Sequence, residues 1–171
     1  MFLSLIKKLS LKKIVKNKLT GLNAPLEGQI KQIGLLIDGV NFSKTEQLIK
    51  EFTQYGISQN QIKALVYTKN KAFENTENII YFRPNNITVS GNIVDETIKK
   101  FADYPFDLLV NYYDTEQINL DYINVKSKAG FKAGFMLNEQ RLNHFMIDVP
   151  ISEYRLFTEE LFKYLKVLNK I

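Results

Sequence analysis

The sequence predicts one doubly wound α/β domain, with a Rossmann-like or flavodoxin-like parallel sheet of about five strands, a basic N-terminal helical arm and a long C-terminal helix. Short continuous apolar runs are expected of strands buried on both faces, and Ile33–Ile37 is the clearest of them. Segments with apolar residues at helical spacing alternate with these runs, which implies right-handed crossovers. The 171 residues can bury a core without disulfides, and a chain with no cysteine forms none.

The first 18 residues are basic and helical in pattern. They hold six of the 23 basic residues and none of the 18 acidic ones, which leaves 17 basic and 18 acidic residues for the rest of the chain. A first apolar stripe consists of Phe2, Leu5, Ile6 and Leu9, and a second stripe of Leu11, Ile14, Val15 and Leu22. Because the two stripes lie on nearly opposite faces, we expect the helix either to bend near Ser10 or to contact two surfaces.

A linker and an alternating body follow the arm. Gly21, Pro25 and Gly28 predict a loop over residues 20–29, so we divide the chain into a basic helix with its linker (1–29) and an α/β domain (30–171). Strands are expected at Ile33–Ile37, Ile62–Tyr67, Asn78–Phe82, Phe106–Tyr112 and Phe131–Leu137. Helices are expected after Ser43, over Ile93–Phe101, through Leu120, Ile123 and Val125, and from about Ser152. Ser43 and Glu46 fit a capping box for the first of these, and Gly56 fits its left-handed stop.

Composition and missing motifs exclude several classes of chemistry. Without cysteine and with one histidine, the chain has no thiolate nucleophile, iron–sulfur cluster, cysteine-ligated zinc or histidine-rich metal site. No predicted strand is followed by a Gly-x-Gly-x-x-Gly turn or by a P-loop, so dinucleotide binding and P-loop nucleotide hydrolysis are not favoured. The Gly-x-Ser-x-Gly elbow of serine hydrolases is also missing, and His144 is the only possible base. We therefore expect no cofactor.

Two acidic residues lie where a doubly wound sheet binds its ligands. Asp38 ends the first predicted strand and Asp114 follows the fourth, so both are expected at the carboxyl edge of the sheet. Together with Asn41 they could bind Mg²⁺ or Mn²⁺ and support phosphodiester hydrolysis. The competing interpretation, which we favour, is that Asp38 and Asp114 are polar strand ends that cap loops or helices.

Two resemblances to known families bear on this choice. The residues Ile37–Asn41 resemble the first-strand motif of NYN/PIN-type ribonucleases, and that resemblance implies a metal-dependent ribonuclease with Asp38, Asn41 and Asp114 in its site. The later Ser-Gly-Asp-x-Asp-Phe pattern of those enzymes is matched only by Asp114. Residues 34–38, 106–114, 141–148 and 161–166 resemble a family of small uncharacterised bacterial α/β proteins. The second resemblance implies one compact domain with an N-terminal arm, and it transfers no catalytic residue.

The arm predicts a non-enzymatic RNA-binding protein. Clustered lysines bind polyanions because neutralised phosphates release counterions, and 20 lysines against three arginines favour backbone contact over base reading. We expect structured RNA as the partner, in particular ribosomal RNA together with ribosomal proteins that pack on the apolar residues of the arm. The predicted RNA-binding residues are Lys7, Lys8, Lys12, Lys13, Lys16, Lys18, Arg141 and His144. For His144 the competing interpretation is a hydrogen-bonded structural residue.

Two other interpretations of the arm stay open. In one, the helix docks on its own domain and its lysines are only solvated. In the other, the protein is peripheral on an anionic membrane surface, although two separate stripes fit a bilayer less well than one continuous apolar face. Lysines interrupt every apolar run of the arm, so we expect neither a secretory signal nor a transmembrane span, and we place the protein in the cytoplasm.

Overall fold

The computed structural model describes residues 2–19, 28–137 and 139–171. Most of the predicted linker, and Leu22 of the second stripe, lie outside these residues. The helices are α1 (Phe2–Lys18), α2 (Thr45–Thr53), α3 (Glu96–Asp103), α4 (Ile118–Lys126) and α5 (Tyr154–Val167). The strands are β1 (Ile33–Asp38), β2 (Ile62–Tyr67), β3 (Ile79–Phe82), β4 (Leu108–Tyr112), β5 (Phe131–Phe135) and β6 (Phe145–Ile147). None of the described helices is long and apolar enough to cross a bilayer.

The six strands form one parallel sheet in the order β3-β2-β1-β4-β5-β6. This confirms the predicted doubly wound fold, with six strands in place of about five. The extra strand is β6, which the sequence did not reveal because it has only three residues and lies at the edge of the sheet. The strand order reverses between β1 and β4, and Asp38 of β1 lies opposite Tyr67 of β2.

The central strand β1 is buried on both faces of the sheet. Ile33, Leu35 and Ile37 join the core on one face, and Leu36 joins the core on the other. A strand buried on both faces has to be apolar throughout, which is the pattern that predicted it. Gly34 also faces the second core, and a Cβ atom there would lie 2.8 Å from the Phe106 ring, so this position has no room for a side chain.

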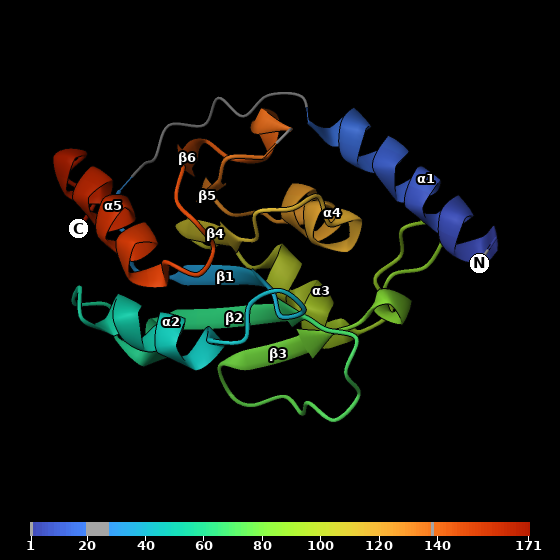
Figure 1. The fold of residues 1–171 in the computed structure, drawn as a ribbon, viewed down its shortest axis with the longest axis horizontal. Helices are drawn as coiled ribbons and strands as arrows, with labels where there is room; N and C mark the ends of the chain where they lie inside the picture. The colour runs from blue at the N-terminus through green and yellow to red at the C-terminus, as the bar shows by residue number, and fades with distance from the viewer. Residues whose placement is uncertain (1, 20–27, 138) are drawn as a thin grey trace.

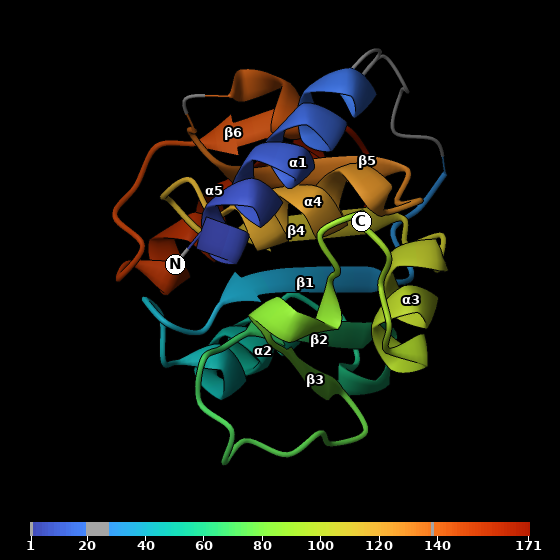
Figure 2. The ribbon, with the colours of Figure 1, turned by 90° about the vertical axis from the view of Figure 1, so that its right-hand side faces the viewer.

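The helices cover the two faces unequally (Figure 1). Helices α2 and α5 cover one face, where Phe52 and Phe157 pack against the sheet. Helices α3 and α4 cover the other, and α1 forms an additional layer outside α4. Figure 2 shows α1 crossing in front of α4. The molecule is therefore thicker on the α4 face than on the α5 face.

Helix α1 runs without interruption through Ser10, so the predicted bend is not present. Leu11, Val15 and Leu19 are buried against the body, and each buried aliphatic side chain contributes about 1.5–3 kcal/mol to docking. Beside them Ile14 lies close to Gly91, where a Cβ atom would come within 2.8 Å of its Cδ1 atom. The second stripe is thus the docking face of α1.

Several local predictions were wrong, among them the ends of two elements, since α3 begins at Glu96 and not at Ile93, and β5 ends at Phe135 and not at Leu137. The capping box at Ser43 does not form, because α2 begins at Thr45 and Lys44, which precedes it, makes no side-chain cap. Strand β4 begins at Leu108 and not at Phe106, because the Asp107 carboxylate accepts hydrogen bonds from the backbone of residues 31 and 32 at 2.9 and 2.8 Å. The predicted left-handed residue after α2 is confirmed at Gly56, whose φ is +87°.

Candidate nucleic-acid interface

Most lysines of α1 face solvent. Lys8, Lys13, Lys16 and Lys18 are exposed, and none of them has an ion-pair partner in the described part of the chain. The two remaining lysines of α1 contact the body. Lys7 is half-buried and donates to the Pro84 carbonyl oxygen, and its partial burial lowers its pKa. Lys12 pairs with Glu116 at 3.1 Å.

The first stripe of α1 is not covered by the domain. Phe2 is 75% exposed and Leu9 is 61% exposed, and Leu3, Leu5 and Ile6 are exposed beside them. Large side chains of this kind on consecutive turns form an apolar patch rather than isolated surface residues. The two stripes therefore differ in burial, since the second docks α1 on the domain and the first is exposed.

A groove lies between the N-terminal half of α1 and the carboxyl edge of the sheet. Its volume is about 750 Å³. The residues that define this basic groove are Lys7, Lys8, Tyr67, Lys69, Pro84 and Asn119. Lys7 and Lys8 come from α1, whereas Lys69 follows β2 and Asn119 lies in the first turn of α4. Segments from different parts of the sequence thus bring three lysines, together with Glu116, to one hollow.

Asn119 and Tyr67 form the buried wall of the basic groove. The Asn119 amide nitrogen donates to the Gln117 Oε1 atom at 3.1 Å and to the Tyr67 hydroxyl at 3.4 Å. Among the residues that the structure describes, the Asn119 Oδ1 atom finds no hydrogen-bond partner, although Asn119 is only 7% exposed. Burial, and secondarily the charge of Asp38, raises the pKa of Tyr67. The hydroxyl therefore stays protonated.

A second groove of about 500 Å³ lies beside the C-terminal half of α1. The residues that define this acidic groove are Lys12, Lys16, Asp114, Glu116, Asp121 and Glu139. Asp121 is 5% exposed, and its burial raises the pKa of its carboxyl group to about 7. Glu116 lines both grooves, so the Lys12–Glu116 ion pair stands at their common border.

The predicted metal ligands have different surroundings in the structure. The Asp38 carboxylate accepts from the backbone of Val40 at 3.0 Å and from the Asn41 side chain at 2.7 Å, so these residues hold the loop after β1. Asp114 is exposed and lines the acidic groove. Across the ranges that the structure describes, no group of three acidic or histidine side chains is arranged to hold a metal ion.

Arg141 and His144 already have internal partners. The Arg141 guanidinium donates to both Glu139 carboxylate oxygens at 2.7 Å. The His144 Nδ1 atom accepts from the backbone of Lys132 at 2.9 Å, and its ring stacks on Phe131 at 5.1 Å. Burial lowers the pKa of His144, so the neutral imidazole is favoured. These bonds place both residues in the local structure around β5 and β6.

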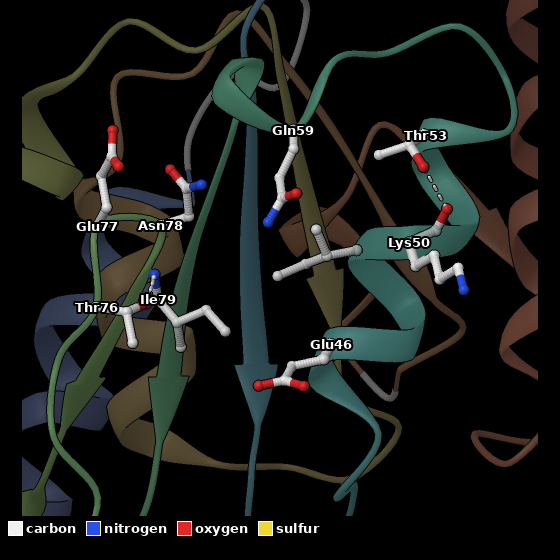
Figure 3. Close-up of a pocket in the computed structure, with 9 residues that line it drawn as sticks. Glu46, Lys50, Thr53, Gln59, Thr76, Glu77, Asn78 and Ile79 are labelled. Carbon is white, nitrogen blue, oxygen red and sulfur yellow. Dashed lines mark hydrogen bonds between the residues drawn. The ribbon is translucent and has the colours of Figure 1, made fainter.

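A third hollow, of about 530 Å³, lies on the opposite side of the sheet between α2 and β3 (Figure 3). The Gln59 side chain points into it, while the Lys50 ammonium group points away from Glu46. Thr53 donates to the Lys50 carbonyl oxygen and is thereby satisfied within α2. None of the candidate site residues predicted from the sequence lines this hollow, and the charged side chains that line it are of both signs.

Sequence reasoning missed Tyr67, Lys69, Asn119 and Asp121. Tyr67 and Lys69 stand at the end of β2, and the rule that ligands bind at carboxyl ends of parallel strands was a signal that could have drawn attention to them. Asn119 and Asp121 lie within a helix, where their burial depends on α1 docking above α4. No pattern in the local sequence predicts the contact between α1 and α4.

Comparison with known proteins gives the family but no activity. The chain belongs to a family of unknown function, DUF6913, whose model matches residues 7–168. The expectation of an uncharacterised family over most of the chain is confirmed by this match, which says nothing about the ribonuclease resemblance. No curated protein and no solved structure matches the chain.

Proposed function

We propose that this member of the DUF6913 family is a non-enzymatic RNA-binding protein that associates with the ribosome through α1. The observation that carries the proposal is the placement of Lys8, Lys13, Lys16 and Lys18, which are exposed on a helix whose other side is fixed to the body. A docked helix holds its charges in fixed positions, so less conformational entropy is lost when a polyanion binds. The Lys12–Glu116 pair does not diminish this set, since Lys12 is not among the four.

The apolar first stripe fits the same proposal. RNA phosphates do not require Phe2, Leu5 or Leu9, whereas a ribosomal protein beside the RNA would cover them. Lysine without arginine on α1 favours contact with the RNA backbone over recognition of base edges. We therefore expect binding that is weakly selective for sequence and strongly dependent on salt.

Sedimentation of the full chain with ribosomal particles tests the proposal. Residues 1–18 cannot simply be deleted, because Leu11 and Val15 are part of the core. The informative variant replaces Lys8, Lys13, Lys16 and Lys18 with Gln, and the control replaces the exposed Lys50, Lys71, Lys100 and Lys166 of the body with Gln. Both variants lose the same charge.

We expect the wild type and the control variant to co-migrate with ribosomal particles at low salt, and the α1 variant to remain at the top of the gradient. For RNA alone, four phosphate contacts predict that the logarithm of the binding constant falls by about 3 per tenfold increase in salt. Equal loss of co-migration in the two variants, or none in either, would contradict a role for α1 in RNA binding.

A peripheral membrane protein is the second candidate, and one observation favours it. The objection that the apolar residues of the arm lie on two faces loses weight, because the second stripe is docked on the domain and the first stripe stands free beside the lysines. Replacing Phe2 and Leu5 with Ser should then abolish retention on anionic vesicles at low salt. If the wild type is not retained on such vesicles, this candidate is eliminated.

A further inference from the structure

The basic groove lies where doubly wound sheets bind ligands. The strand order reverses between β1 and β4, and the groove is lined from the end of β2 and from the loop after β4, on either side of β1. The crevice outside the carboxyl ends next to such a reversal is the usual ligand site of open α/β sheets. Its volume of about 750 Å³ is that of a small-molecule site.

Three lysines determine what charge the groove favours. Lys7 and Lys8 reach it from α1, and Lys69 reaches it from the segment after β2. Lys7 spends one of its three donors on the Pro84 carbonyl oxygen, which leaves two for a ligand. The acid in the lining, Glu116, is paired with Lys12. The groove is therefore cationic and rich in donors, as a phosphate group requires.

The buried wall favours a ligand with more than a phosphate. Asn119 Oδ1 lacks a partner, and an unsatisfied buried acceptor costs about 1–3 kcal/mol. This oxygen is covered by its neighbours, so a ligand N–H or O–H reaches it only after the Asn119 side chain turns toward the groove, and the bond then offsets this cost. The exposed ring of Phe2 and the side chain of Pro84 add apolar surface on which a planar group can lie.

From these features we infer that the basic groove seats one nucleotide, with its phosphate on Lys7, Lys8 and Lys69 and its ribose or base facing Tyr67 and Asn119. The inference rests on the proposed function where the nucleotide belongs to an RNA strand. A free nucleoside monophosphate offers the same chemistry and would occupy the same groove.

The test titrates the full chain with AMP and, separately, with a labelled single-stranded RNA. The variant is Lys69→Glu, and the matched control is Lys71→Glu, an exposed lysine in the same loop that does not line the groove. Converting a phosphate-binding ammonium group to a carboxylate should weaken AMP binding about tenfold or more, whereas the control should change it by less than about twofold. Thermal unfolding of both variants verifies that they are folded.

The outcomes distinguish nucleotide binding in the basic groove from RNA binding along α1. AMP binding that weakens in Lys69→Glu alone supports the inference, with a strand nucleotide as the occupant if RNA displaces AMP and a free nucleotide if it does not. Equal weakening in both variants overturns it, as does retention on anionic vesicles without any AMP binding. RNA binding without AMP binding overturns the groove and leaves the proposed function intact. AMP binding without RNA binding supports the basic groove as a nucleotide site and contradicts the proposed function.

Discussion

Two adjacent tyrosines show how differently the faces of the sheet are built. Tyr112 points toward α5, and its hydroxyl donates to the Ile151 carbonyl oxygen at 2.7 Å. Tyr113 points toward α4 and is fully buried, and within the described ranges its hydroxyl makes no hydrogen bond of good geometry, although it lies beside the Asp121 carboxyl group. Within the described ranges, every buried side-chain polar atom without a partner belongs to residues 111–124, on the α4 face.

The two faces of the sheet therefore differ in how many buried polar groups they leave without hydrogen bonds, which lowers stability. On the α5 face, aromatic rings such as Phe157 and Phe135 pack 4.7 Å apart between their centroids, and polar groups are satisfied. On the α4 face, five residues of the described ranges have an unsatisfied side-chain atom, and two of them line the grooves of α1, Asn119 the basic groove and Asp121 the acidic groove. Buried polar groups without partners are rare in folded proteins, and each is explained by strain, a functional role, or a bound water molecule or ion. We place function on the α4 face because it carries α1 and both of its grooves.

The largest effect is expected on the well-packed face. Phe157→Ala removes a fully buried ring that contacts Tyr112 and Phe135, with centroids 5.0 and 4.7 Å away. Loss of transfer energy together with the cavity should lower the free energy of unfolding by about 3–5 kcal/mol, measured by urea denaturation. A loss below about 1 kcal/mol would show that this face is not the rigid one.

An intermediate effect of opposite sign is expected at Asp121. Its pKa in the folded protein, about 7, lies above its unfolded value, so the folded state binds the extra proton and stability falls as pH rises from about 4 through 7. Asp121→Asn removes this penalty and should stabilise the protein above pH 7 by up to about 4 kcal/mol, with little change near pH 4. Denaturation curves at both pH values check this, and a difference independent of pH would refute it.

The smallest effect comes from the tyrosine pair itself. Tyr112→Phe loses the hydrogen bond to Ile151 and should destabilise the protein by about 1 kcal/mol. Tyr113→Phe removes a buried hydroxyl that lies beside the Asp121 carboxyl group but makes no hydrogen bond of good geometry within the described ranges, so it should leave stability unchanged or raise it by up to about 1 kcal/mol. The two variants control for each other, because they change the same atom on neighbouring residues. Equal losses would mean that the faces do not differ.

The sequence predicted the fold better than the site, for a physical reason. Strand β1 is buried at every residue, and that burial leaves the continuous apolar run Ile33–Ile37, which can be read directly from the sequence. The placement of β6 and the start of β4 depend on single contacts, such as those of Asp107, that no periodicity records.

The lysines of α1 were evident because charge clusters along the chain. The groove was not, because Lys69 and Asn119 meet Lys7 only after the sheet and α1 have come together. A site built from distant segments has no signature in any one of them. Its residues become visible only with the strand order and the position of α1.

The docking of α1 also has a consequence for synthesis of the protein. Lys12 and its partner Glu116 are separated by 104 positions, and the apolar face of α4 follows Glu116. At ordinary elongation rates α1 waits about 5–20 s before α4 is made. During that interval the apolar residues and all six lysines of the α1 segment lack the α4 surface on which the helix docks in the folded protein. The segment therefore remains without its docking partner until most of the chain has been made.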